Sequence, residues 1–303
     1  MVVSLKLNKF QNKSISLPSR SHPSTLRIEE QLNLIKSSSS STPSVDNICN
    51  RLSQLVELHR LTDGLLVLPV TQNLIAFHRN TMWVDQVLEV SMKLLDICSS
   101  IRDVVLQMVE RVRDLECALR RRKHHTSIQI GIANYIEFRK KTKKEAKELI
   151  TRLKQSEKVN GVEVDLDNHD LPEVMRVLME VTEVTVSIFE SLLTYVSVSV
   201  SVSAPVLKLK GWSFVVWKLM HKGAIASCKE DGKHKGVVNE LEAVDVSLVN
   251  ILNGGEQRVE VMQMMQLRLE VMQARMQKIE SGLECIFRVL VKIRASLLNI
   301  MSL

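Results

Sequence analysis

The densest concentration of chemically usable side chains is a basic segment in the first half of the chain. Between residues 120 and 147, ten lysines and arginines are opposed only by Glu137 and Glu145. The ten cations are Arg120, Arg121, Arg122, Lys123, Arg139, Lys140, Lys141, Lys143, Lys144 and Lys147. Because the formal net charge of the whole chain is +7, the rest of the sequence is close to neutral. A cluster of this kind attracts surfaces rich in phosphate or carboxylate through long-range electrostatics.

Three interpretations of the basic segment stay open. It can be the solvated face of a helix, a docking surface for an acidic protein or an anionic membrane, or a nucleic-acid site. Nucleic acid is the least favoured, because only Tyr135 and Phe138 lie nearby to stack on bases. We therefore expect a protein partner of unknown identity and keep an anionic membrane surface as the alternative. Neither nucleic acid nor a small-molecule substrate is expected.

The residues that usually carry catalysis or hold metals lack the required spacing. His124 and His125 are adjacent, so on a helix they point about 100° apart, a poor arrangement for a metal. No glycine-rich phosphate loop occurs. The five cysteines are widely spaced and form no CxxC pair: Cys49, Cys98, Cys117, Cys228 and Cys285. We expect free thiols in a reducing compartment.

From these patterns we expect no catalytic residue, no metal and no cofactor, and hence a protein that is not an enzyme. The alternative is an enzyme whose site carries no recognisable motif. A deep pocket lined by close carboxylates or histidines would favour that alternative.

Long helices must position these groups, because the composition offers few residues that break a helix. Hydrophobic residues make up 45% of the 303 residues and aromatic residues 4%, with Gly 10 and Pro 6. From Trp83 to Met108 the apolar positions alternate spacings of four and three, and they continue to Leu119. This pattern predicts a helix of about forty residues that ends in the basic segment. A second helix, over 127–154, carries the remaining cations, and its apolar face fades from Arg139 to Lys144.

The last helix has the most regular apolar pattern in the chain. Twelve residues alternate spacings of three and four: Met262, Met265, Leu269, Met272, Met276, Ile279, Leu283, Ile286, Leu290, Ile293, Leu297 and Ile300. Such a seam is typical of a coiled coil. Burial of each side chain stabilises by about 1.5–3 kcal/mol, so the seam must be covered. We expect cover from the same chain, with a second copy as the alternative. The methionines either fill the core or form an adaptable surface for a partner.

Residues 1–44 are basic and rich in serine, and we expect a disordered leader with at most a short helix near 26–35. An organellar transit peptide is an alternative interpretation of this segment. No apolar run reaches the roughly 18–20 residues of a membrane span. We expect an intracellular, cytoplasmic protein, with peripheral membrane association and organellar import as alternatives.

Residues 45–303 are expected to form a single all-α domain, an elongated antiparallel bundle of long helices. Asp46 is the expected N-cap of a helix that ends near Leu66. Further helices are expected over 174–196, 212–220 and 237–252. The Val-Ser repeat at 196–203 is interpreted as a frayed helix end or a linker. Loops are expected near 155–171, 197–210, 222–236 and 253–256.

Several short segments, in order along the whole chain, carry a family resemblance. They are Ser16–Pro23, Leu68–Gln72, Trp83–Asp85 continuing to Leu94–Cys98, Arg139–Lys141, Glu190–Leu193, Trp212–Ser213, Asn239–Glu242, Gly282–Arg288 and Arg294–Ile300. On these residues the chain resembles the plant family called domain of unknown function 241, which is related to the Bypass proteins. The resemblance implies a helix-rich land-plant protein connected with root and shoot development. It brings no enzymatic activity and no catalytic residue.

Overall fold

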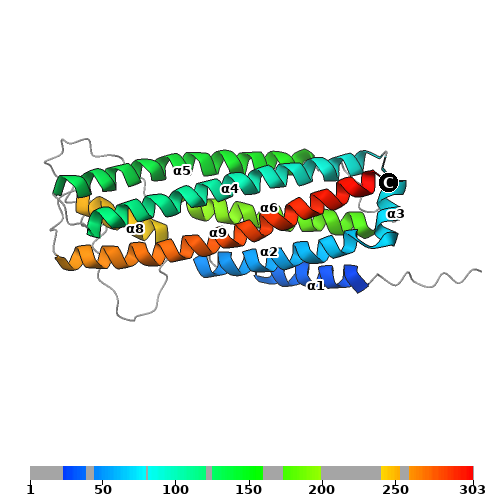
Figure 1. Ribbon diagram of the computed structural model, residues 1–303, viewed down its shortest axis with the longest axis horizontal. Coiled ribbons are helices and arrows are strands. Elements are labelled where there is room, and N and C mark those ends of the chain that lie inside the picture. The colour runs from blue at the N-terminus through cyan, green and yellow to red at the C-terminus, as the bar shows by residue number, and fades with distance from the viewer. Residues whose placement is uncertain are drawn as a thin grey trace, which may run out of the picture.

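The computed structural model describes residues 23–38, 44–79, 81–120, 125–159, 173–198, 240–252 and 259–302. Within these ranges the secondary structure is α-helical apart from short turns, which confirms the predicted all-α bundle. The helices are α1 (Pro23–Ser37), α2 (Val45–Leu66), α3 (Pro69–Phe77), α4 (Met82–Arg120), α5 (His125–Val159), α6 (Glu173–Ser197), α8 (Glu240–Leu252) and α9 (Val259–Met301). Figure 1 shows the long helices aligned along one axis, with α3 lying across one end.

The longest two helices, α4 and α9, run antiparallel along the centre of the bundle (Figure 1). Cys98 lies beside Leu283, while Arg294 near the end of α9 donates to the carbonyl of Leu88 near the start of α4. Arg120, at the other end of α4, faces Glu270. The two periodic patterns in the sequence therefore form one shared interface.

The seam of α9 is covered within the chain, as predicted. Eleven of its twelve positions are buried, and Met262 is half-buried at the open end. On its second side α9 packs against α2, close enough that a Cβ at Gly282 would lie 3.3 Å from the Cβ of Leu52. Most of its methionines fill the core, whereas Met264 is 59% exposed.

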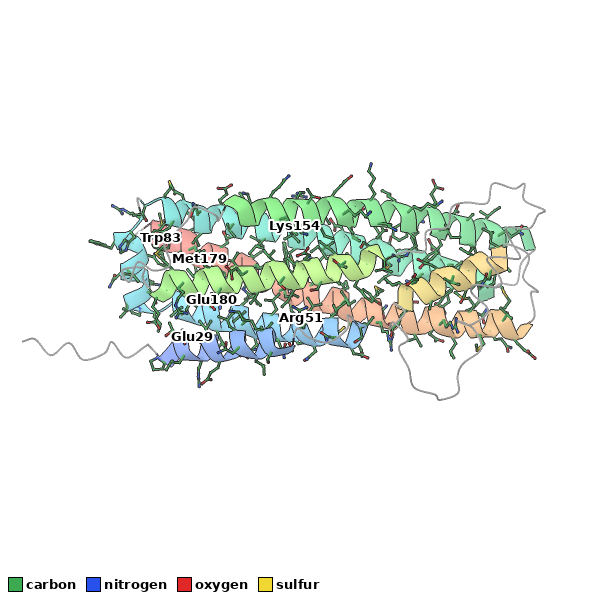
Figure 2. The ribbon with its side chains drawn as sticks, turned by 180° about the vertical axis from the view of Figure 1, so that it is seen from behind. Glu29, Arg51, Trp83, Lys154, Met179 and Glu180 are labelled. Atoms are coloured by element: carbon green, nitrogen blue, oxygen red, sulfur yellow. The ribbon has the colours of Figure 1, made fainter. Side chains whose placement is uncertain are left out.

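Residues 23–37 correct the prediction of a leader that extends to residue 44. They form α1, which is longer than the short helix expected there and packs on α2 and α6. Ile28, Leu32 and Ile35 form a buried stripe on this helix. Its polar side is tied to α6 by an ion pair between Glu29 and Arg176 and by another between Lys36 and Glu180. Figure 2 shows Glu29 and Glu180 in the same part of the bundle.

The ends of several helices differ from the sequence-based prediction. Ser44, rather than Asp46, caps α2, because its side chain accepts a hydrogen bond from the N–H of Asn47. Helix α5 continues to Val159, into the segment predicted as a loop. Val196 and Ser197 of the Val-Ser repeat belong to α6. The expected helix over 212–220 and the loops over 199–210, 222–236 and 253–256 lie outside the described residues.

Candidate functional site

The inner face of α5 determines which of its cations reach the surface. Its buried positions alternate spacings of four and three without interruption: Ile128, Ile132, Tyr135, Arg139, Thr142, Ala146, Leu149 and Leu153. The sequence predicted that the apolar face fades from Arg139 to Lys144 and returns at Ala146, whereas the buried stripe continues through this segment. Two polar side chains, Arg139 and Thr142, occupy core positions within it.

The prediction that Arg139 belongs to the basic surface is therefore wrong. It is 2% exposed, and its Nε lies 3.2 Å from a carboxylate oxygen of Asp245 on α8. Its terminal nitrogens donate to the carbonyls of Val196, at 2.9 Å, and of Val198. These carbonyls lie at the C-terminus of α6, where a cation is favourable. Arg139 thus joins α5, α6 and α8.

Asp245 and Arg139 stabilise each other's charge in the interior of the bundle. Burial raises the pKa of the Asp245 carboxyl, and the Arg139 guanidinium acts in the opposite direction by stabilising the carboxylate. Tyr135 lies beside the pair, and its pKa is raised well above the usual value by burial and then by the charge of Asp245. A buried charge without its partner is costly, so each member of this pair requires the other.

The remaining lysines of the segment lie on the outer side of α5. Lys140, Lys141, Lys144 and Lys147 are exposed, and we call these four residues the α5 basic face. Lys143 is half-buried. Arg120 is exposed but forms ion pairs with Glu116 and, at 3.8 Å, with Glu270. Arg121, Arg122 and Lys123 lie outside the described residues.

The α5 basic face is poorly neutralised. Lys144 approaches Glu148 only to 3.8 Å, and Lys140, Lys141 and Lys147 form no ion pair with any described residue. Lys140, Lys144 and Lys147 lie three or four positions apart, so their charges repel one another along one ridge of the helix. Arranging the cations in this way does not stabilise α5. It leaves them available to an external anion.

Chemistry other than charge has little support in the described part of the chain. No group of three or more His, Cys, Asp or Glu side chains there could hold a metal ion. A shallow hollow between α4 and α5 measures about 70 Å³ and contains one carboxylate and no histidine. It is lined by Arg111, Asp114, Leu115, Gly131, Asn134 and Tyr135. No described helix is both long enough and apolar enough to span a bilayer.

In a comparison with known protein families, the family described as Protein BPS1 matches residues 51–300 of the chain. The chain belongs to this family. The match agrees with the resemblance read from the short sequence segments, and it identifies a plant family. Within the BPS1 range lie the α5 basic face, the Arg139–Asp245 pair and the seam of α9, whereas α1 precedes it. No curated protein and no solved structure matches the chain.

The sequence-based prediction missed the Arg139–Asp245 pair. A usable signal for Arg139 was present, because it continues the alternation of four and three in the buried stripe of α5. Nothing in the sequence connects it with Asp245, which is 106 positions away. The pairing depends on how α8 packs against α5, and the pattern of one helix does not contain that information.

Proposed function

We propose that this BPS1-family protein is a non-enzymatic interaction protein whose α5 basic face binds an acidic surface of a protein partner during root and shoot development. The single observation that carries the proposal is the outward ridge of Lys140, Lys144 and Lys147 beside Lys141, with little neutralisation from this chain. Electrostatic complementarity of this type increases the association rate and the specificity of a complex.

The way α5 is anchored supports the same proposal. Its inner face packs on α4 and α6, and Arg139 fixes it to α8 through Asp245. The four lysines of the basic face therefore project from a rigid helix. Rigid presentation lowers the entropy lost on binding, which favours a specific partner over general attraction of anions.

We place this binding inside the cell, in the cytoplasm. The thiols of Cys117 and Cys285 are free and exposed, and a reducing compartment preserves that state. The aromatic side chains support a protein partner over nucleic acid, because Tyr135 is buried and not available to stack on a base, which leaves only the half-buried Phe138.

Proximity labelling in root tissue, with the labelling enzyme fused to this chain, tests the proposal. Three proteins are compared: the wild type, a basic-face variant, and a control variant with the same change in net charge. The basic-face variant carries Lys140→Glu, Lys141→Glu, Lys144→Glu and Lys147→Glu. The control carries Arg60→Glu, Arg113→Glu, Lys278→Glu and Arg288→Glu, at exposed positions on α2, α4 and α9.

The expected result is a set of acidic proteins labelled by the wild type and by the control but not by the basic-face variant. The same labelled set with all three proteins would show that the α5 basic face does not select a partner.

A further inference from the structure

The most exposed apolar side chains gather at the end of the bundle that α3 crosses. Among the described residues, the three large hydrophobic side chains with the greatest exposure are Phe77 at 85%, Val70 at 76% and Met82 at 65%. Val67, at 56%, lies in the turn before α3. We call these four residues the apolar tip. Figure 1 shows α3 across this end of the molecule, near the C-terminus of α9.

Helix α3 carries apolar side chains on both its inner and its outer side, and Asn73 is exposed between Val70 and Phe77 on the outer side. Its inner side buries Thr71 and Ile75, while Val70 and Phe77, seven positions apart, share the outer side. Exposed apolar side chains that lie close together often mark a surface for a partner or a membrane. The outer side of α3 is such a surface.

The local structure shows that the apolar tip is held in place. The turn after α3 is closed by a hydrogen bond from the Thr81 N–H to the carbonyl of His78, at 2.9 Å. The His78 ring stacks edge-on against Phe77, with centroids 5.1 Å apart, and lies 6.2 Å from the ring of Trp83. Figure 2 shows Trp83 at this same end of the bundle. The exposed side chains therefore project from an ordered support.

The charge around the apolar tip distinguishes between its possible occupants. From Gly64 to Val84 the sequence contains no aspartate or glutamate, and its one permanently charged residue is Arg79, which is exposed. Asp85, exposed in the first turn of α4, offsets Arg79, so an anionic surface is neither strongly attracted nor strongly repelled. Four side chains of this size offer a few hundred Å², roughly half of the about 800 Å² that each partner buries in a stable protein interface. The strength of membrane binding instead scales with the apolar area that inserts, so a smaller area still gives weak, reversible binding.

We infer that the apolar tip inserts into the interfacial region of a phospholipid bilayer and gives the protein a weak, reversible membrane contact. Phe77, Val70, Met82 and Val67 enter the boundary between headgroups and acyl chains, and Arg79 remains at the headgroups. Aromatic and aliphatic side chains beside a cation are typical of protein surfaces that bind at this boundary. The site is separate from the α5 basic face and does not depend on it.

Co-sedimentation with vesicles tests the inference on the full-length chain. Vesicles of phosphatidylcholine alone, and of phosphatidylcholine mixed with phosphatidylserine, are compared at low salt and at about 0.5 M salt, where electrostatic attraction is screened. The test variant is Val70→Ser with Phe77→Ser. The matched control is Met264→Ser with Leu267→Ser, which removes two exposed apolar side chains from α9. All four positions are exposed, so each variant is expected to keep the wild-type thermal unfolding temperature, measured by circular dichroism.

The wild type and the control are expected to bind both kinds of vesicle and to remain bound at high salt. The tip variant is expected to lose about tenfold or more in partition coefficient, because it lacks two of the apolar side chains that insert into the bilayer. Absence of wild-type binding, equal binding by the tip variant, or loss of all binding at high salt would overturn the inference. A wild-type dimer in light scattering that becomes a monomer in the tip variant would assign the apolar tip to a second copy and would also overturn it.

Discussion

At the scale of single residues, His59 gives the bundle a predictable response to acid. It is buried between α2 and α6, with Nε2 3.1 Å from the Thr185 hydroxyl. That hydroxyl donates its proton to the carbonyl of Val181, so it accepts at His59, and we assign a neutral imidazole protonated on Nε2. Burial lowers the pKa of His59 from 6.5 to about 4.

The direction of the pH dependence follows from the difference in the pKa of His59 between the unfolded and the folded chain. The unfolded chain takes up this proton below pH 6.5, and the folded chain takes it up only near pH 4. Between these values the free energy of unfolding falls by about 1.4 kcal/mol for each unit decrease in pH. Urea denaturation at about pH 7 and at about pH 5 measures this effect. Between these two pH values the free energy of unfolding should fall by about 2 kcal/mol more in the wild type than in His59→Leu. An equal loss in both proteins would contradict a neutral buried His59.

The buried pair gives a second prediction at this scale. Arg139→Met leaves Asp245 buried without its partner and leaves two carbonyls of α6 without their donor, so the free energy of unfolding should fall by about 3–5 kcal/mol. Adding Asp245→Leu removes the unpaired carboxylate and should restore part of that loss. The neighbouring Lys140→Met, at an exposed position, should change stability by less than about 0.5 kcal/mol. Urea denaturation of the four proteins measures this, and similar stability of Arg139→Met and Lys140→Met would contradict the burial of Arg139.

At the scale of helices, two glycines provide a matched comparison. Gly64 of α2 has nothing within 4 Å of the position where a Cβ would lie, so Gly64→Ala should stabilise by about 0.5–1 kcal/mol through helix propensity. Gly282 of α9 lies against Leu52, with 3.3 Å between the two Cβ positions. The same substitution, Gly282→Ala, should therefore destabilise by about 1–3 kcal/mol, because the added Cβ overpacks α2 against α9. Thermal or urea unfolding measures both variants. Equal effects would mean that the close approach of α2 and α9 is absent in solution.

The helices also show what one sequence can reveal. The spacing of apolar residues predicted α4 and α9, because a seam of this length must be buried and only a helix aligns its members. Helix α1 was assigned to the leader because its stripe of Ile28, Leu32 and Ile35 is short and lies in a serine-rich context. Its burial depends on α2 and α6, which meet it only in the folded chain. The cations of the α5 basic face were predicted from composition. The spacing of the buried stripe could have excluded Arg139 from that surface, whereas its pairing with Asp245 required the packing of α8 against α5.

At the scale of the whole molecule, the internal cover of the seam predicts the oligomeric state. Helices α2 and α4 occupy the face of α9 that a second copy would need for a coiled-coil dimer. Light scattering of the purified protein, without lipid or partner, should therefore give the mass of one chain, 34.4 kDa. A stable dimer that persists on dilution would favour the alternative of a self-assembling structural protein.

The two proposed contact surfaces, the α5 basic face and the apolar tip, lie in different parts of the molecule. Helix α5, which carries the basic face, runs along the side of the bundle, and α3, which carries Val70 and Phe77 of the apolar tip, lies across one end (Figure 1). The first depends on charge and should weaken with salt, while the second depends on apolar insertion and should persist. A rigid bundle with contacts of different chemistry in two places is suited to bring a partner protein to a membrane surface.

The most direct test of the central claim is the affinity of a partner recovered by labelling for purified wild-type protein, the basic-face variant and the charge-matched control, titrated over a range of salt concentrations. The control is expected to bind like the wild type. The basic-face variant is expected to bind about tenfold or more weakly and with a smaller dependence on salt, because its charge pairs are lost. The same dissociation constant and the same salt dependence for all three proteins would contradict the claim that the α5 basic face is the binding surface.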